Sequence, residues 1–107
     1  MKSYQVAVFG KWQNQEVLAY RFENEQGYQL RVMTYGATIL EYVTPDKEDR
    51  FANIILGFDC FEDYIGNSPK YGASIGPVAG RIAGASFELN GKTYHLEANN
   101  EHNCNHS

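Results

Sequence analysis

Short apolar runs, each broken by glycine or a polar turn, are the feature that most constrains how this 107-residue chain can fold. In residues 28–34, the apolar Tyr28, Leu30 and Val32 alternate with polar residues, which is typical of a strand with one side in water. Similar runs predict further strands over residues 4–9, 17–22 and 37–43, and a short buried strand over residues 53–58.

The Asn90-Gly91 pair predicts the best-defined hairpin of the chain. Both central residues of a type I′ turn need a positive φ angle, which Asn and Gly adopt readily, and the turn places Phe87 opposite Tyr94. The whole pattern amounts to about seven strands and one helical turn at residues 60–65, with Asp59 as its N-cap. We therefore predict an all-β fold, an antiparallel β-sandwich, with residues 1–107 as a single domain.

Glycine recurs at every fourth position from Gly72 to Gly84, in a segment that also contains Pro77. Proline and β-branched residues disfavour a helix, so we interpret this segment as loops and bulged strand. Its start, Tyr71-Gly-Ala-Ser-Ile75, echoes Tyr35-Gly-Ala-Thr-Ile39. Two such matches do not establish a structural repeat, and we interpret them as two strands with the same glycine-dependent entry.

Charge and cysteine content exclude several classes of protein. The formal net charge is −4 without a basic stripe, which argues against a nucleic-acid partner. No apolar run approaches the roughly 20 residues that cross a bilayer, and the first residues lack the apolar stretch of a secretion signal, so no membrane partner is expected. The two cysteines, Cys60 and Cys104, fit no paired-cysteine motif, so we expect free thiols in a cytoplasmic protein.

Three residues near the end of the chain form a possible metal site. His102, Cys104 and His106 alternate there, and an extended backbone would put all three on one side. His and Cys at such spacing bind zinc or copper, but short His-rich tracts are common compositional coincidences. We therefore expect no metal.

Arg81 is the candidate binding residue that stands out from its surroundings. It lies between Gly80 and the short run Ile82-Ala83-Gly84, and small neighbours let a ligand approach the backbone closely. A guanidinium offers fixed donors to oxygen-rich ligands, so Arg81 with a histidine further along suggests a sugar-binding pair. The alternative is a structural arginine that donates to loop carbonyls.

Four stretches together resemble the N-terminal part of the aldose 1-epimerase (galactose mutarotase) family. They are Thr34-Tyr-Gly-Ala-Thr-Ile39; Asn53-Ile-Ile-Leu-Gly-Phe-Asp59 with Tyr64; Tyr71-Gly-Ala-Ser-Ile-Gly-Pro-Val-Ala-Gly-Arg-Ile82; and the Asn90-Gly-Lys-Thr-Tyr94 hairpin running into Asn99-Asn100. Their order and spacing are those of the family. The resemblance implies part of a galactose-mutarotase-like supersandwich that interconverts the α and β anomers of an aldose, without a metal or organic cofactor.

The resemblance also implies the roles of individual residues. Arg81 matches the family's substrate-binding arginine, and His106 matches a histidine that contacts substrate. Gly80 stands where the family often has Asn, and Asn105-His106-Ser107 stands where it has Leu-His-Gly-Gly. The general acid, a histidine, and the general base, a glutamate, are expected beyond the C-terminus, so no catalytic residue is assigned in this chain.

Two functions follow as expectations. The first is an aldose 1-epimerase-like protein of which this chain is an apparently truncated N-terminal part, carrying part of the sugar site and inactive alone. The alternative is a non-catalytic carbohydrate-binding or interaction module derived from that fold. Its partner is a small-molecule sugar, and self-association through exposed sheet edges is possible because unpaired edges accept further strands.

Overall fold

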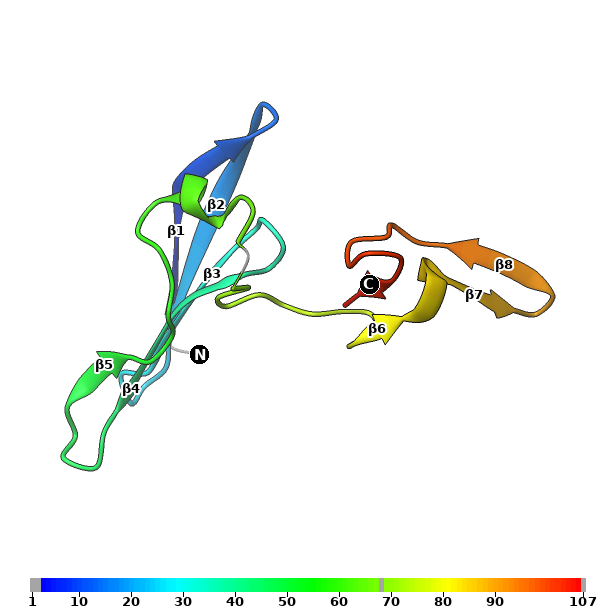
Figure 1. Cartoon of the computed structure of the whole chain (residues 1–107). Coiled ribbons are helices and arrows are strands. Elements are labelled where there is room, and N and C mark those ends of the chain that lie inside the picture. The colour runs from blue at the N-terminus through cyan, green and yellow to red at the C-terminus, as the bar shows by residue number, and fades with distance from the viewer. Residues whose placement is uncertain (1–2, 68, 107) are drawn as a thin grey trace. The chain divides into compact units, whose positions relative to one another are not determined.

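The computed structural model describes residues 3–67 and 69–106, which fall into two compact units (Figure 1). Unit 1 spans Met1–Ser74 and unit 2 spans Ile75–Ser107. In Figure 1 the strands of unit 1 run from blue to green, and those of unit 2 from yellow to red. That residues 1–107 form a single domain stays a prediction.

Unit 1 is built on a five-stranded antiparallel sheet in which each strand pairs with its neighbour in sequence. Its strands are β1 (Ser3–Trp12), β2 (Gln15–Glu23), β3 (Gln29–Met33), β4 (Ile39–Pro45) and β5 (Phe51–Asn53). The first four contain most of the apolar runs from which strands are predicted. Gln13 and Asn14, both at positive φ, form the tight turn between β1 and β2.

The core of unit 1 lies on one face of this sheet. Val17, Ala19, Met33 and Leu40 are buried there against Phe61 and Tyr64 of the single-turn helix η1 (Phe61–Tyr64). Only 1% of Phe61 is exposed. A Cβ atom at Gly10 would lie 2.5 Å from the Cβ of Phe61, so glycine is what lets β1 pass this ring.

The buried strand predicted over residues 53–58 is wrong. β5 ends at Asn53, and Ile54 and Leu56 are 62% and 72% exposed. The Asn53 side chain gives the reason, because its Oδ1 accepts the main-chain N–H of Tyr42 at 2.9 Å and of Ile55 at 3.1 Å. The amide oxygen occupies a donor that a longer β5 would need, so regular pairing with β4 stops.

The cap predicted for the helical turn is also wrong. The turn is a 3₁₀ helix, and its N-cap residue is Cys60 rather than Asp59, with no hydrogen bond from a capping side chain. The buried Tyr64 anchors it instead, since its hydroxyl accepts the Phe58 N–H at 3.0 Å. Packing therefore determines this turn more than capping does.

Asp46 organises the turn between β4 and β5. Its Oδ1 accepts the main-chain N–H of Arg50 at 3.0 Å and of Glu48 at 2.7 Å. These bonds, the one from Arg50 first, hold the pKa of the Asp46 carboxyl below its usual value, because they favour the charged form.

The two echoing segments meet in unit 1. Gly36 and Gly72 share a φ of 66°, so the predicted glycine-dependent entry is present in both. The Ile39 N–H donates to the Gly72 carbonyl at 2.8 Å, and the Ser74 hydroxyl donates to the Ala37 carbonyl at 2.6 Å. Residues 71–75 form no strand, so this part of the prediction is wrong. They are a loop tied to the start of β4.

Unit 2 contains the predicted hairpin and a second strand pair that the sequence does not predict. β7 (Ser86–Leu89) and β8 (Lys92–His95) pair with Phe87 opposite Tyr94, and the Asn90 and Gly91 φ angles are 54° and 76°. β6 (Arg81–Ile82) pairs with β9 (Cys104–Asn105), and the short η2 (Ala83–Ala85) joins β6 to β7. The glycine-rich stretch from Gly72 to Gly84 thus contains β6 and runs into η2.

Neither short helix in the described part of the chain, residues 3–67 and 69–106, is long and apolar enough to cross a membrane.

We expect Phe61→Ala to destabilise unit 1 by about 3–5 kcal/mol, because truncating a fully buried aromatic ring leaves a cavity between the sheet and η1. Urea unfolding followed by the fluorescence of Trp12, the only tryptophan, measures the loss. Phe51→Ala is the matched control, since Phe51 is 47% exposed. Equal losses in the two variants would contradict the placement of the core.

Candidate functional site

The pairing of β6 with β9 brings the two predicted binding residues into one place in unit 2. Arg81 lies opposite Asn105, and Ile82 lies opposite Cys104, which is buried. His106 follows directly after β9. Residues that are far apart in sequence thus meet at one edge of a two-stranded ribbon, and the apolar Ile82–Cys104 pair lies beside the polar one.

His106 is tied to Gly80 by two hydrogen bonds. The His106 N–H donates to the Gly80 carbonyl at 2.7 Å, and the Gly80 N–H donates to Nδ1 of His106 at 3.0 Å. An imidazole nitrogen that accepts a hydrogen bond carries no proton, so Nε2 is the ring nitrogen that can donate. The ring is thereby oriented with one donor left for a ligand. Gly80 has a φ of 77°, a conformation that favours glycine.

Arg81 is held at one of its three guanidinium nitrogens. Its Nε donates to Oδ1 of Asn100 at 2.8 Å, and the residue is exposed. Within residues 3–67 and 69–106, no salt bridge or hydrogen bond involves its Nη1 or Nη2. The guanidinium is therefore held at Nε, and Nη1 and Nη2 can donate together to an oxygen-rich ligand.

A loop of asparagines supports both residues. Asn99 Oδ1 accepts the Asn105 N–H at 2.7 Å, and Asn99 Nδ2 donates to the Asn105 carbonyl at 3.1 Å. Asn103 Oδ1 accepts the Gly84 N–H at 3.1 Å, while the main chains of Asn100 and Asn103 bond to each other. The side-chain amides of this loop make main-chain hydrogen bonds that a neighbouring strand would make in a wider sheet.

Sequence reasoning found Arg81 and His106 but assigned no site role to Asn99, Asn100 or Asn103. A signal was present, because asparagine occupies four of the seven positions from 99 to 105. Asparagine side chains bond readily to nearby main chain, and such a cluster is typical of a structured loop. The roles of Arg81 and His106 as substrate contacts stay predictions.

His102, Cys104 and His106 do not form the one-sided arrangement that a metal site would need. Cys104 is buried whereas His102 is exposed, so they do not share one accessible side. Across the described residues, no group of three or more His, Cys, Asp and Glu side chains is placed to hold a metal ion.

Comparisons with known proteins identify relatives over almost the whole chain. The family model described as aldose 1-epimerase matches residues 19–107. A maltose epimerase of Levilactobacillus brevis is 42% identical over 97 residues, covering 91% of this chain and 28% of that protein. A galactose mutarotase of Homo sapiens is 35% identical over 107 residues, covering 99% of this chain and 31% of that protein.

Solved structures show the same fold. The crystal structure of galactose 1-epimerase from Lactobacillus acidophilus superposes with a TM-score of 0.72 and 23% identity, covering 97% of this chain and 30% of that one. The predicted all-β antiparallel class, as part of a galactose-mutarotase-like fold, is confirmed. The chain spans less than a third of the length of these relatives.

We expect Asn99→Leu to loosen the end of β9, because the leucine removes both side-chain bonds to Asn105. Hydrogen exchange measured by NMR should show the His106 amide exchanging about fivefold faster, which corresponds to the roughly 1 kcal/mol of a hydrogen bond. His102→Ala, at an exposed position of the same loop, should leave this amide unchanged. Similar protection in both variants would remove the supporting role of Asn99.

Proposed function

Because the chain belongs to the aldose 1-epimerase family, we propose that it serves the interconversion of α and β anomers of an aldose, and that it contributes Arg81 and His106 to the sugar site. The observation that supports the proposal is the β6–β9 pairing, which joins the two segments: Arg81 lies opposite Asn105, and His106 is bonded to Gly80, the residue before Arg81. A family match alone would leave those positions unconnected.

The donors available at this site suit a sugar. In the proposal, Nη1 and Nη2 of Arg81 donate to hydroxyl or ring oxygens, and Nε2–H of His106 supplies a third donor. Hydrogen bonds from a charged group contribute about 1.5–3 kcal/mol, more than bonds between neutral groups. The asparagine loop lowers the entropic cost of binding, because Arg81 is already held at Nε.

Anomer interconversion needs two proton transfers. A base removes the proton of the anomeric hydroxyl while an acid protonates the ring oxygen; the ring opens, the C1–C2 bond rotates and the ring closes again. In the proposal neither group belongs to these 107 residues, which act by binding and orienting the sugar. The chain by itself is then a binding unit without turnover.

The compartment and the assembly state are part of the same proposal. Cys60 and Cys104 are both free thiols, which supports a reducing cytoplasm. β1 and β5 are the outer strands of the unit 1 sheet, and their unpaired edges favour self-association of the isolated chain. The sugar is proposed only as an aldose, since the relatives' names include both maltose and galactose.

The chain should bind an aldose weakly through Arg81. Saturation-transfer NMR with D-galactose and with maltose should give signals that Arg81→Ala weakens at least about tenfold, because the truncation removes charged hydrogen bonds of about 1.5–3 kcal/mol. Lys92→Ala is the control, since Lys92 is an exposed cation of unit 2 that lies against Tyr94. Aldose binding that is unchanged in Arg81→Ala would disprove this role of Arg81.

Alone, the chain should not accelerate mutarotation. Polarimetry with freshly dissolved α-D-glucose or α-D-galactose should give the buffer rate at every protein concentration, because the chain supplies no acid–base pair. A rate that rises with the concentration of the chain, and falls in Arg81→Ala, would place the catalytic groups within these residues. If the chain binds an aldose, and a longer family member that contains the chain also fails to accelerate mutarotation, the non-catalytic module is supported instead.

A further inference from the structure

A pocket in unit 1 lies at the tip of the β1–β2 hairpin and contains none of the residues proposed to bind the sugar. It encloses about 240 Å³ and is lined by Trp12, Gln15, Glu16, Val17, Thr34, Tyr35 and Gly36. We call it the Trp12 pocket. Gln15 precedes the buried Val17 by two positions, and Trp12 lies opposite Gln15. These three side chains therefore project from the face of the sheet that packs on η1.

Two aromatic rings form a corner of the Trp12 pocket. The centroids of the Trp12 and Tyr35 rings are 5.7 Å apart, and the ring planes are inclined at 73°. Tyr35 also packs edge-on against Phe61, with centroids 5.2 Å apart, and Phe61 is 1% exposed. Tyr35 is thus held by the core, whereas Trp12 is 36% exposed and within reach of a ligand. Because both walls are already in place, the ordering cost of binding is low.

Two ring faces set nearly at right angles favour a positively charged ligand. The face of an aromatic ring carries the negative part of its quadrupole, and it attracts a cation that lies within about 6 Å of the centroid. Since the centroids of Trp12 and Tyr35 are 5.7 Å apart, one cation can lie within that distance of both. A quaternary ammonium suits such a corner best, because its methyl groups pack on the rings while its charge is attracted.

Charge near the Trp12 pocket supports the same ligand class. Glu16 is an exposed lining residue, and within residues 3–67 and 69–106 its carboxylate forms no salt bridge. Lys11 lies opposite Glu16 in the strand register but does not line the pocket. Both project from the other face of the hairpin, so Glu16 acts at a distance, within the roughly 8–10 Å over which charges interact in physiological salt. The formal net charge of −4 also attracts cations.

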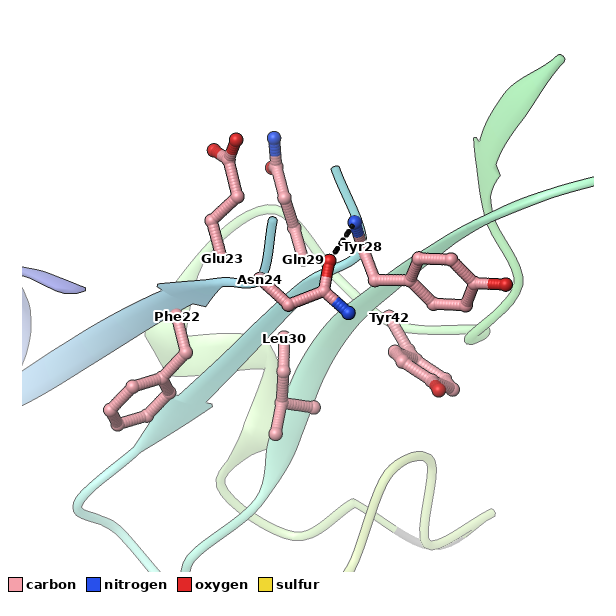
Figure 2. A pocket seen from close by; sticks show the side chains of 7 residues that line it. All are labelled: Phe22, Glu23, Asn24, Tyr28, Gln29, Leu30 and Tyr42. Carbon is pink, nitrogen blue, oxygen red and sulfur yellow. Dashed lines mark hydrogen bonds between the residues drawn. The ribbon is translucent and has the colours of Figure 1, made fainter. Parts of the chain in front are cut away.

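A hollow at the opposite end of β2 offers no such corner (Figure 2). Its walls are largely apolar, and Leu30 lies between Phe22 and Tyr42 in this view. Within residues 3–67 and 69–106, none of the aromatic rings that line this hollow packs against another of them. The Asn24 side-chain oxygen there already accepts the Tyr28 N–H at 2.9 Å, which the dashed line marks. We therefore assign no ligand to this hollow.

We propose that the Trp12 pocket binds a small quaternary ammonium compound such as choline. The ammonium lies in the corner between Trp12 and Tyr35. The hydroxyl of choline bonds to Thr34, whose Oγ1 accepts the Leu18 N–H at 3.0 Å and still has a proton to donate. The pocket is slightly smaller than the roughly 300–1,000 Å³ typical of small-molecule pockets, which suits a ligand of this size. The proposal involves no residue of unit 2, so it does not rest on the proposed function.

Trp12 is the only tryptophan, so its fluorescence reports on this pocket alone. The 107-residue chain is titrated with choline chloride at constant ionic strength, and with the uncharged isostere in which a carbon atom replaces the ammonium nitrogen. Choline should change the emission saturably, with a dissociation constant on the order of 1–10 mM. The isostere should bind at least about fivefold more weakly, because it keeps the shape and loses the charge. Equal binding of the two, or no saturation with choline, would overturn the proposal.

Saturation-transfer NMR on the methyl signal of choline tests the residues. Trp12→Leu should weaken binding at least about fivefold, because it removes the more exposed wall of the corner. Tyr4→Leu is the matched control, since Tyr4 is an exposed aromatic residue of the same strand and does not line the pocket. Glu16→Gln, at an exposed position that tolerates the change, should weaken binding about two- to threefold at low salt and less at high salt. Equal effects of Trp12→Leu and Tyr4→Leu would contradict the assignment.

Arg81→Ala separates the Trp12 pocket from the proposed sugar site. It should leave the choline titration unchanged, and a choline signal that requires Arg81 would overturn the proposal. Loss of aldose binding with choline binding retained would refute only the proposed function. Phosphatidylcholine vesicles present the same ammonium on a lipid, and a response to vesicles without a response to free choline would replace the small molecule by a membrane surface and so overturn the proposal.

Discussion

The packing of Phe61 and Tyr64 against one face of a five-stranded sheet is the constraint on which unit 1 depends. A meander of strands has two faces, and the loop from residue 54 to residue 74 is long enough to cover one of them. Gly10 shows how close that cover lies, because its backbone has no room for a side chain beneath Phe61. The other face of the same sheet stays partly exposed, with Tyr4 and Val8 each 58% exposed.

Unit 2 is held together largely by hydrogen bonds between polar groups. Among the described residues of unit 2, Ala85 and Cys104 are buried and Ile82 is half-buried, so hydrophobic burial alone would hold this unit weakly. Asparagine side chains supply the missing hydrogen bonds, and the reciprocal pair between Gly80 and His106 closes the end. Polar bonding that stabilises the loop also orients the side chains that a ligand would meet, so stability and binding share residues.

Local signals in the sequence were enough for the strands of the meander and for the hairpin. Alternation along residues 28–34 and the Asn90-Gly91 pair act within a few residues; the first forms β3, and the second forms a hairpin with the predicted Phe87–Tyr94 pairing. β6 and β9 could not be predicted in this way, because two residues carry no periodicity and their pairing depends on distant chain. The early end of β5 was missed for a similar reason: Asn53 competes through its side chain, which a hydrophobicity pattern does not register. Arg81 was indicated by its small neighbours and by resemblance, and His106 chiefly by resemblance, whereas the supporting asparagines act through contacts that no sequence pattern shows.

The anchoring of Arg81 through Nε separates two tasks within a single side chain. Nε bonds to Asn100 of the protein itself, and in the proposed sugar site Nη1 and Nη2 donate to the ligand. A lysine has one nitrogen on a flexible side chain, so it could not bond to Asn100 and also present two spaced donors to the ligand. If Arg81 binds the sugar as proposed, Arg81→Lys would conserve the charge but not the number and spacing of the donors.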